Sequence, residues 1–95
     1  MTGPVNSLSD CPKRSSECVY RAIGEEGGLV VLPGRAEVKV LNPVGVKVFS
    51  LLDGEHTVEE IVAAVTAEFE VPAEAAKLDV QVFLGELAAQ GMLGG

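Results

Sequence analysis

The sequence predicts an α+β fold in which a three-stranded antiparallel meander is followed by three helices. Up to Leu41, apolar residues alternate with polar ones or form short runs between turn residues, which is typical of strands. From Asn42 onward, apolar residues recur at spacings of three and four, which is typical of amphipathic helices. The 95 residues suffice for one domain, and no internal repeat is present. This order of elements favours a winged helix-turn-helix architecture.

Residues 18–23 and 29–32 are the first two predicted strands. The first contains several β-forming side chains, and the second is wholly apolar and follows a turn at residues 25–28. Residues 1 to about 16 are rich in Ser, Pro, Gly and Asn without periodicity, so we expect a flexible arm there. The predicted domain therefore covers residues 17–93, with residues 94–95 as a tail.

The Pro33-Gly34 pair predicts a type II turn before the third strand. Proline presets the first central φ of such a turn, and glycine accepts the positive φ of the second. Residues 36–41 then alternate as a strand. Ala36, Val38 and Val40 share one face of it, and Glu37 and Lys39 share the other.

Two capped helices follow the third strand. Asn42 is a good N-cap and Pro43 suits the first helical position, while Gly54 is expected to end this first helix. Thr57 and Glu60 have the spacing of a capping box, which starts a second helix that ends near residue 70, before a proline.

The third predicted helix covers residues 73–90 and ends before Gly91. A helical wheel gathers four apolar residues on a core face: Val80, Phe83, Leu84 and Leu87. A second, weaker apolar stripe lies opposite, formed by Leu78, Val82, Gly85 and Ala89. The two flanks between these stripes differ in charge. Lys77 and Gln81 lie on one flank, and Asp79, Glu86 and Gln90 lie on the other.

Composition and charge exclude several classes of function. No apolar run approaches the about 20 residues that cross a bilayer, and the first 17 residues lack the apolar segment of a secretory signal. A cytoplasmic protein without a membrane partner is therefore expected. Lys and Arg total 7 against 14 Asp and Glu, for a net charge of −7, which disfavours nucleic-acid binding.

No arrangement typical of catalysis, cofactor binding or metal binding is found in the sequence. Ser50 lies within a predicted helix, and the single His56 stands among acidic neighbours. Cys11 and Cys18 have a spacing that matches no common zinc or redox motif, so no role is assigned to them. We therefore expect a non-catalytic protein without a cofactor or metal.

Three other classes of protein remain as alternatives. A winged-helix nucleic-acid-binding regulator would have the same fold, although the third helix has Lys77 as its only cation. A sulfur carrier would use the terminal Gly94-Gly95, but such carriers alternate strands and helices along the chain. An acyl carrier would place a serine at a helix N-terminus, whereas Ser50 lies inside a helix.

The ordered pattern resembles the PqqD-like family, which is also called the RiPP recognition element, after ribosomally synthesised, post-translationally modified peptides. The pattern covers residues 17–93 and consists of Leu32-Pro33, Leu41-Asn42, Leu51-Leu52-Asp53-Gly54, Thr57, Glu60-Ile61, Phe69, Asp79, Phe83-Leu84, Leu87 and Gly91-Met92-Leu93. The resemblance implies a peptide chaperone. It would hold the leader segment of a precursor peptide and present it to a modifying enzyme, commonly a radical SAM enzyme. Either a monomer or a homodimer is compatible with this role.

In this family the leader peptide adds as an extra strand to the third strand and rests against the third helix. The resemblance thus implies a groove between the third strand and the Lys77/Gln81 flank of the third helix. An edge strand with open backbone groups suits such strand addition. Gly85 would provide a dip for ligand side chains. The peptide-binding residues expected on this basis are Glu37, Val38, Lys39, Val40, Leu41, Lys77, Gln81, Leu84 and Gly85.

Overall fold

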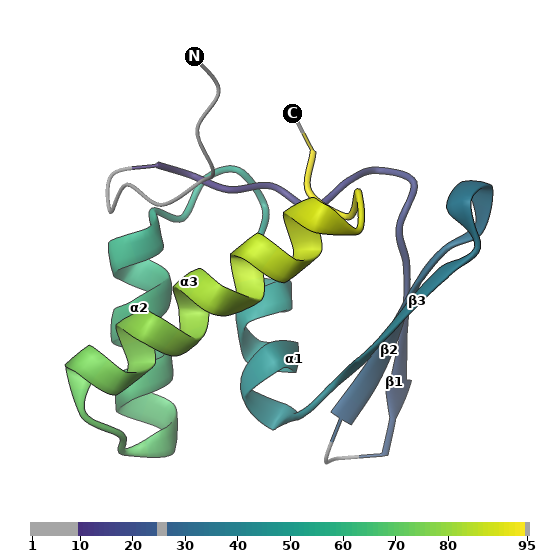
Figure 1. The fold of residues 1–95 in the computed structure, drawn as a ribbon. Coiled ribbons are helices and arrows are strands. Elements are labelled where there is room, and N and C mark those ends of the chain that lie inside the picture. Colours follow the sequence, from purple (N-terminus) through teal and green to yellow (C-terminus); the bar gives the residue numbers. More distant parts are fainter. Residues whose placement is uncertain (1–9, 25–26, 95) are drawn as a thin grey trace.

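The computed structural model describes residues 10–24 and 27–94 (Figure 1). Strands β1 (Val19–Ile23), β2 (Gly27–Leu32) and β3 (Glu37–Leu41) form an antiparallel sheet in the order β1-β2-β3. Helices α1 (Pro43–Ser50), α2 (Val58–Phe69) and α3 (Ala73–Ala89) follow. The predicted α+β fold class is confirmed. Part of the predicted turn between the first two strands, residues 25–26, lies outside the described residues.

The connection between β2 and β3 differs from the predicted type II turn. It is a short 3₁₀ helix, η1 (Pro33–Arg35), and Gly34 does not adopt a positive φ. Ala36 takes the left-handed conformation instead, with φ 55°, and its N–H donates to the Pro33 carbonyl. The proline was correctly read as a turn residue, but the chain reverses two residues later than expected. For that reason β3 begins at Glu37.

The two faces of the sheet have different environments. Val30, Leu32 and Leu41 are buried on the face covered by the helices. The opposite face is open to solvent, and it carries Val38 and Val40, which are 53% and 76% exposed. The apolar side of β3 therefore faces water, and its charged residues lie on the same face as Leu41.

The N-termini of α1 and α2 have the caps that the sequence predicts. The Asn42 side chain accepts a hydrogen bond from the Gly45 N–H at 2.8 Å. Thr57 and Glu60 form the reciprocal capping box of α2, at 3.0 and 2.8 Å. The C-terminus of α1 was predicted too late, because the helix ends at Ser50 and the positive φ of Gly54 (81°) lies in the following loop.

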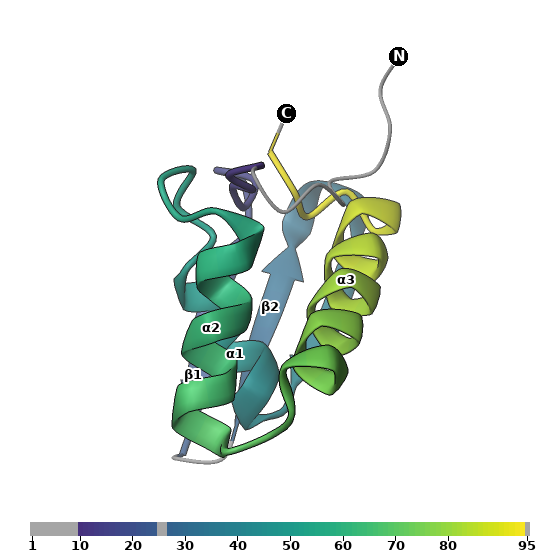
Figure 2. The ribbon, with the colours of Figure 1, turned by 90° about the vertical axis from the view of Figure 1, so that its left-hand side faces the viewer.

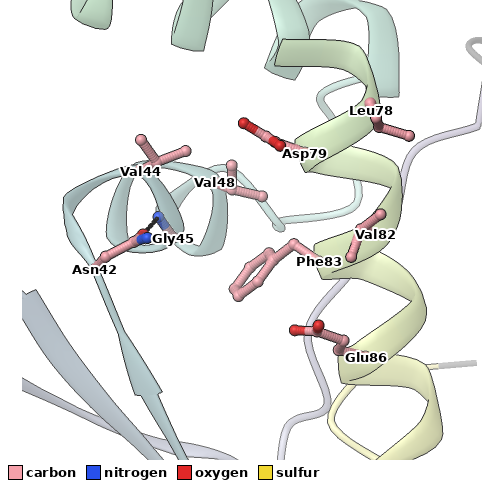
Figure 3. A pocket seen from close by; sticks show the side chains of 9 residues that line it. All are labelled: Asn42, Val44, Gly45, Val48, Leu78, Asp79, Val82, Phe83 and Glu86. Carbon is pink, nitrogen blue, oxygen red and sulfur yellow. Dashed lines mark hydrogen bonds between the residues drawn. The ribbon is translucent and has the colours of Figure 1, made fainter. Parts of the chain in front are cut away.

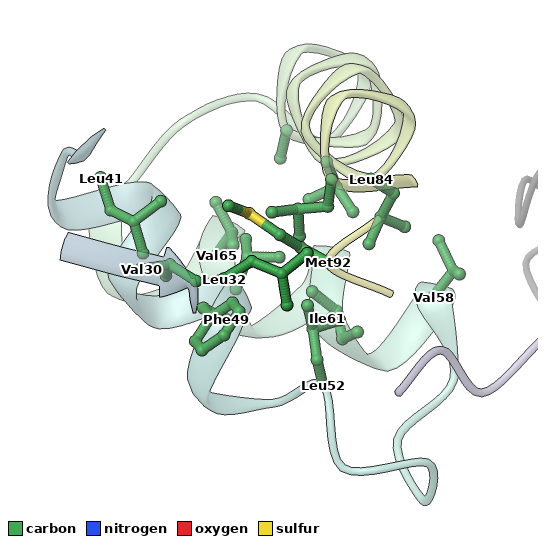
Figure 4. Packing of buried hydrophobic residues seen from close by; sticks show 14 residues of the cluster. Val30, Leu32, Leu41, Phe49, Leu52, Val58, Ile61, Val65, Leu84 and Met92 are labelled. Atoms are coloured by element: carbon green, nitrogen blue, oxygen red, sulfur yellow. The ribbon is translucent and has the colours of Figure 1, made fainter. Parts of the chain in front are cut away.

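The helices cover one face of the sheet, and α1 packs directly on β2 and β3 (Figures 1 and 2). Helix α2 packs on α1 and α3. The core contains residues from the sheet, all three helices and the turn after α3 (Figure 4). Its buried members are Val30, Leu32, Leu41, Val48, Phe49, Leu52, Val58, Ile61, Val65, Ala76, Val80, Leu84, Leu87 and Met92. In the described part of the chain, no helix is long and apolar enough to span a membrane.

Residues 10–16 are held against the rest of the fold, whereas the sequence predicts a flexible arm there. Backbone hydrogen bonds join Arg14 to Leu52, Ser15 to Met92, and Gly94 to Lys13. The remainder of the predicted arm, residues 1–9, lies outside the described residues, as does Gly95. The segment 10–16 thus links the α1–α2 loop to the turn that follows α3.

Candidate functional site

The edge of the sheet at β3 offers unpaired backbone groups. β3 pairs with β2 along one side, and among residues 10–24 and 27–94 no other strand pairs with its second side. In an edge strand, alternate residues direct their N–H and C=O groups outward, where a further strand can bind them. This edge can therefore accept an extended chain.

Helix α3 contacts two side chains of β3, Lys39 and Glu37. Lys39 Nζ lies 2.7 Å from Glu86 Oε1 and 5.5 Å from the centre of the Phe83 ring. Farther toward the start of β3, Gln90 Nε2 donates a hydrogen bond to Glu37 Oε1 at 3.3 Å. These contacts fix which flank of α3 faces the strand. It is the flank that carries Glu86 and Gln90.

A pocket of about 360 Å³ opens where α1, α3 and the end of β3 meet (Figure 3). In Figure 3 the side chains of Asp79, Phe83 and Glu86 point from α3 toward α1 and the end of β3. The volume of this pocket falls within the range of small-ligand sites, about 300–1,000 Å³. The residues that line it are Asn42, Val44, Gly45, Val48, Leu78, Asp79, Val82, Phe83 and Glu86.

The side of this pocket that α1 forms contains a glycine, Gly45. A Cβ at Gly45 would lie 3.3 Å from Asn42 Oδ1 and 3.4 Å from the Phe83 ring. The absence of a side chain at Gly45 thus allows the ring to approach the first turn of α1. Phe83 was predicted on the core face; in the structure it is partly buried and lines the pocket.

The flank of α3 that the sequence analysis placed at the groove does not face β3 in the structure. Lys77 does not line the pocket beside β3; it lines a different pocket between α2 and α3, together with residues such as Val62 and Thr66. Gln81 lies one helical turn from Lys77 on the same flank and is partly buried. The helical wheel separates two flanks but does not tell which one faces the sheet, and the peptide-binding role of Lys77 and Gln81 stays a prediction.

The other expected site residues fall into three environments. Leu41 and Leu84 are buried in the core, so only the backbone of Leu41 is available at the edge. Val38 and Val40 are exposed on the outer face of the sheet. Gly85 is exposed, and a Cβ at this position would have no neighbour within 4 Å, so Gly85 lies on open surface.

Sequence reasoning missed the part of the site that α1 provides. The sequence analysis interpreted Asn42 only as a cap and gave no site role to Val44, Gly45 or Val48. The charge pattern is the signal that could have located the flank of α3 that faces β3. The ammonium group of Lys39 can pair with Glu86, which lies on the flank opposite Lys77.

The described residues show no arrangement that indicates catalysis. His56 Nδ1 lies 2.9 Å from Asp53 Oδ2 in the exposed α1–α2 loop. The backbone N–H of Glu55 and the His56 side chain lower the pKa of Asp53 to about 2. Burial raises the pKa of the Cys18 thiol, so this thiol is not activated. No group of three His, Cys, Asp or Glu in the described ranges could hold a metal ion.

Comparison with known proteins supports the fold and the family. The family model described as coenzyme PQQ synthesis protein D (PqqD) matches residues 28–93, which is more than half of the chain. Among solved structures, the chain is similar to TbiB1 in complex with the TbiA(beta) leader peptide. The TM-score is 0.75 and the identity 31%, over 87% of this chain and 95% of the TbiB1 chain. No curated protein matches the chain by sequence.

Proposed function

Because this chain belongs to the family of coenzyme PQQ synthesis protein D, we propose that it is a RiPP recognition element that binds the leader segment of a precursor peptide. TbiB1 shares the fold at 31% identity, and its structure was solved in complex with a leader peptide. The single observation that carries the proposal is the open edge of β3 beside a pocket on α3. Strand addition there uses backbone hydrogen bonds for affinity and side-chain pockets for specificity.

The protein would act as a non-catalytic partner of a modifying enzyme, for example a radical SAM enzyme. A disordered leader loses about 2–5 kcal/mol of the gross interaction free energy when it is ordered on binding. An affinity near micromolar, about −8 kcal/mol, therefore fits a partner that must also release the peptide.

The alternative functions have less support. A DNA-binding regulator would need cations on α3, but the flank of α3 that faces β3 carries Asp79 and Glu86. A sulfur carrier needs a free C-terminal tail, whereas the Gly94 N–H donates to the Lys13 carbonyl at 2.6 Å. The family match favours neither of them.

The test is an N-methyl scan of a leader peptide taken from a precursor encoded beside this gene. N-methylation removes one backbone N–H at a time. We expect weakened binding at alternate residues and little effect at the residues between them, because only alternate N–H groups of an added strand face β3. Amide NMR shifts should concentrate in β3 and α3. Shifts confined to α2, or effects without alternation, would contradict strand addition.

Two substitutions that change the charge of α3 test which of its flanks contacts the peptide. Val82→Arg places a bulky cation at the rim of the pocket beside β3, and Val82 is 52% exposed, so the fold should tolerate it. Lys77→Glu changes the opposite flank. We expect the first variant to weaken leader binding and the second to leave it nearly unchanged. The reverse result would restore the flank that the sequence resemblance implied.

A further inference from the structure

The pocket between α1 and α3 combines an apolar wall with unbalanced negative charge. Val44, Val82 and Phe83 provide apolar surface, and two carboxylates, Asp79 and Glu86, also line the pocket. None of the residues that line the pocket is a cation. The pocket thus has the chemistry for a side chain that is apolar along its length and positive at its end.

The two carboxylates differ in their availability. Glu86 is already paired with Lys39 at 2.7 Å. Asp79 is exposed, and within the described residues its carboxylate has no ion pair or hydrogen bond. An incoming cation would therefore find Asp79 unpaired, and the net charge of −7 further favours a positive ligand group.

The position of the pocket relates it to a bound strand. Leu41 ends β3, and Asn42, the next residue, already lines the pocket. A peptide paired along the free edge of β3 directs alternate side chains to the face on which Lys39 and Leu41 lie. A side chain of this set, at the end of the strand near Leu41, points toward the pocket.

From this geometry we propose that the pocket selects leader peptides with a lysine or arginine at this position. The proposal rests on the proposed function. The alkyl part of the basic side chain lies against Val44, Val82 and Phe83, and its charged group pairs with Asp79. Lysine and arginine suit such a site, because their stems bury on apolar surface while the charged end stays near water. Asp79 is thus a specificity-determining residue.

Selection from random peptides tests the preference without knowledge of the natural leader. A phage-displayed library of random twelve-residue peptides is panned against the full chain. We expect recovered peptides to share β-forming residues and a lysine or arginine at one fixed position. Panning against the Asp79→Asn variant should recover strand-forming peptides that show no preference for a basic residue at that position. Glu59→Gln on α2 removes the same charge elsewhere and should keep the preference, which controls for net charge.

One recovered peptide then gives the magnitude of the effect. Replacement of its basic residue by norleucine, which keeps the stem, should weaken binding to the wild type about two- to fivefold and leave binding to Asp79→Asn unchanged. Strand-forming peptides without a basic preference, or an equal preference in the Asp79→Asn variant, would overturn the selectivity alone. Failure to recover any peptide that shifts β3 amides would overturn the proposed function as well.

Discussion

Lys39 Nζ on β3 lies 2.7 Å from Glu86 Oε1 on α3, and the same ammonium group lies 5.5 Å from the centre of the Phe83 ring. The pair joins a strand to a helix 47 residues away in the sequence. It holds α3 at the edge of the sheet, beside the backbone groups that a further strand would use. The same contact keeps the Lys39 side chain between β3 and α3.

This ion pair should contribute little to global stability. The Lys39 side chain is 16% exposed and that of Glu86 is 54% exposed, so solvent screens much of the attraction. We expect a double-mutant cycle of Lys39→Met and Glu86→Gln, measured by urea unfolding, to give a coupling free energy of about 0.2–1 kcal/mol. A coupling above about 2 kcal/mol would mean that the pair is a principal stabilising contact of the fold.

Neighbouring apolar residues of β3 should differ sharply in their effect on stability. Val40 is 76% exposed, so Val40→Thr should change the free energy of unfolding by less than about 0.5 kcal/mol. Leu41 is 3% exposed, so Leu41→Ala should lower it by about 2–4 kcal/mol. Thermal and urea unfolding measure both. Similar losses in the two variants would contradict the orientation of β3.

Local patterns explain why so much of the fold was predictable. The Asn42 cap, the Thr57–Glu60 capping box and the stop at Gly91 each depend on a few neighbouring residues. The structure confirms all three. Local chemistry is readable because the backbone groups at a helix end must find partners within one turn.

Local sequence leaves two choices of the fold undetermined. Alternation in β3 shows which residues share a face, but burial of Leu41 at its end decides that Val38 and Val40 face water. The helical wheel likewise separates Lys77 from Glu86 without showing which flank meets the sheet. Both choices depend on how α1 packs between the sheet and α2, which is tertiary information.

Arg14 should be the residue of the N-terminal segment that contributes most to stability. Its Nη1 donates to the carbonyls of Phe49 and Leu52, at 3.4 and 3.2 Å, and its guanidinium lies 5.6 Å from the Phe49 ring centre. The Phe49 carbonyl lies in the last turn of α1 and the Leu52 carbonyl just after it, and each also accepts one backbone hydrogen bond, from the Leu52 N–H and the Arg14 N–H. Arg14→Ala should lower the free energy of unfolding by about 1–2 kcal/mol in urea titrations.

Arg21 provides the matched control for that variant. It is exposed on β1, and the described residues give its side chain no hydrogen bond or ion pair. Arg21→Ala removes the same charge, and we expect a change within about 0.5 kcal/mol. Equal effects of the two substitutions would show that net charge matters more than the contacts of Arg14.

Acid should weaken the loop between α1 and α2 through Asp53. Asp53 Oδ1 accepts hydrogen bonds from the Glu55 and His56 N–H groups at 2.8 and 3.1 Å, and the pKa of the carboxyl is lowered from 3.8 to about 2. A carboxyl with a lowered folded-state pKa stabilises the fold above its unfolded pKa, and this contribution is lost as the pH falls through the folded value. The relevant window is therefore between about pH 4 and pH 2.

Asp53→Asn tests this contribution, because the amide keeps an oxygen acceptor but removes the charge. The melting temperature of the wild type should exceed that of the variant by a constant amount above about pH 4, and the difference should shrink toward pH 2. Thermal melts at a series of pH values, followed by circular dichroism, give the comparison. A difference that stays constant down to pH 2 would show that the charge of Asp53 does not stabilise this loop.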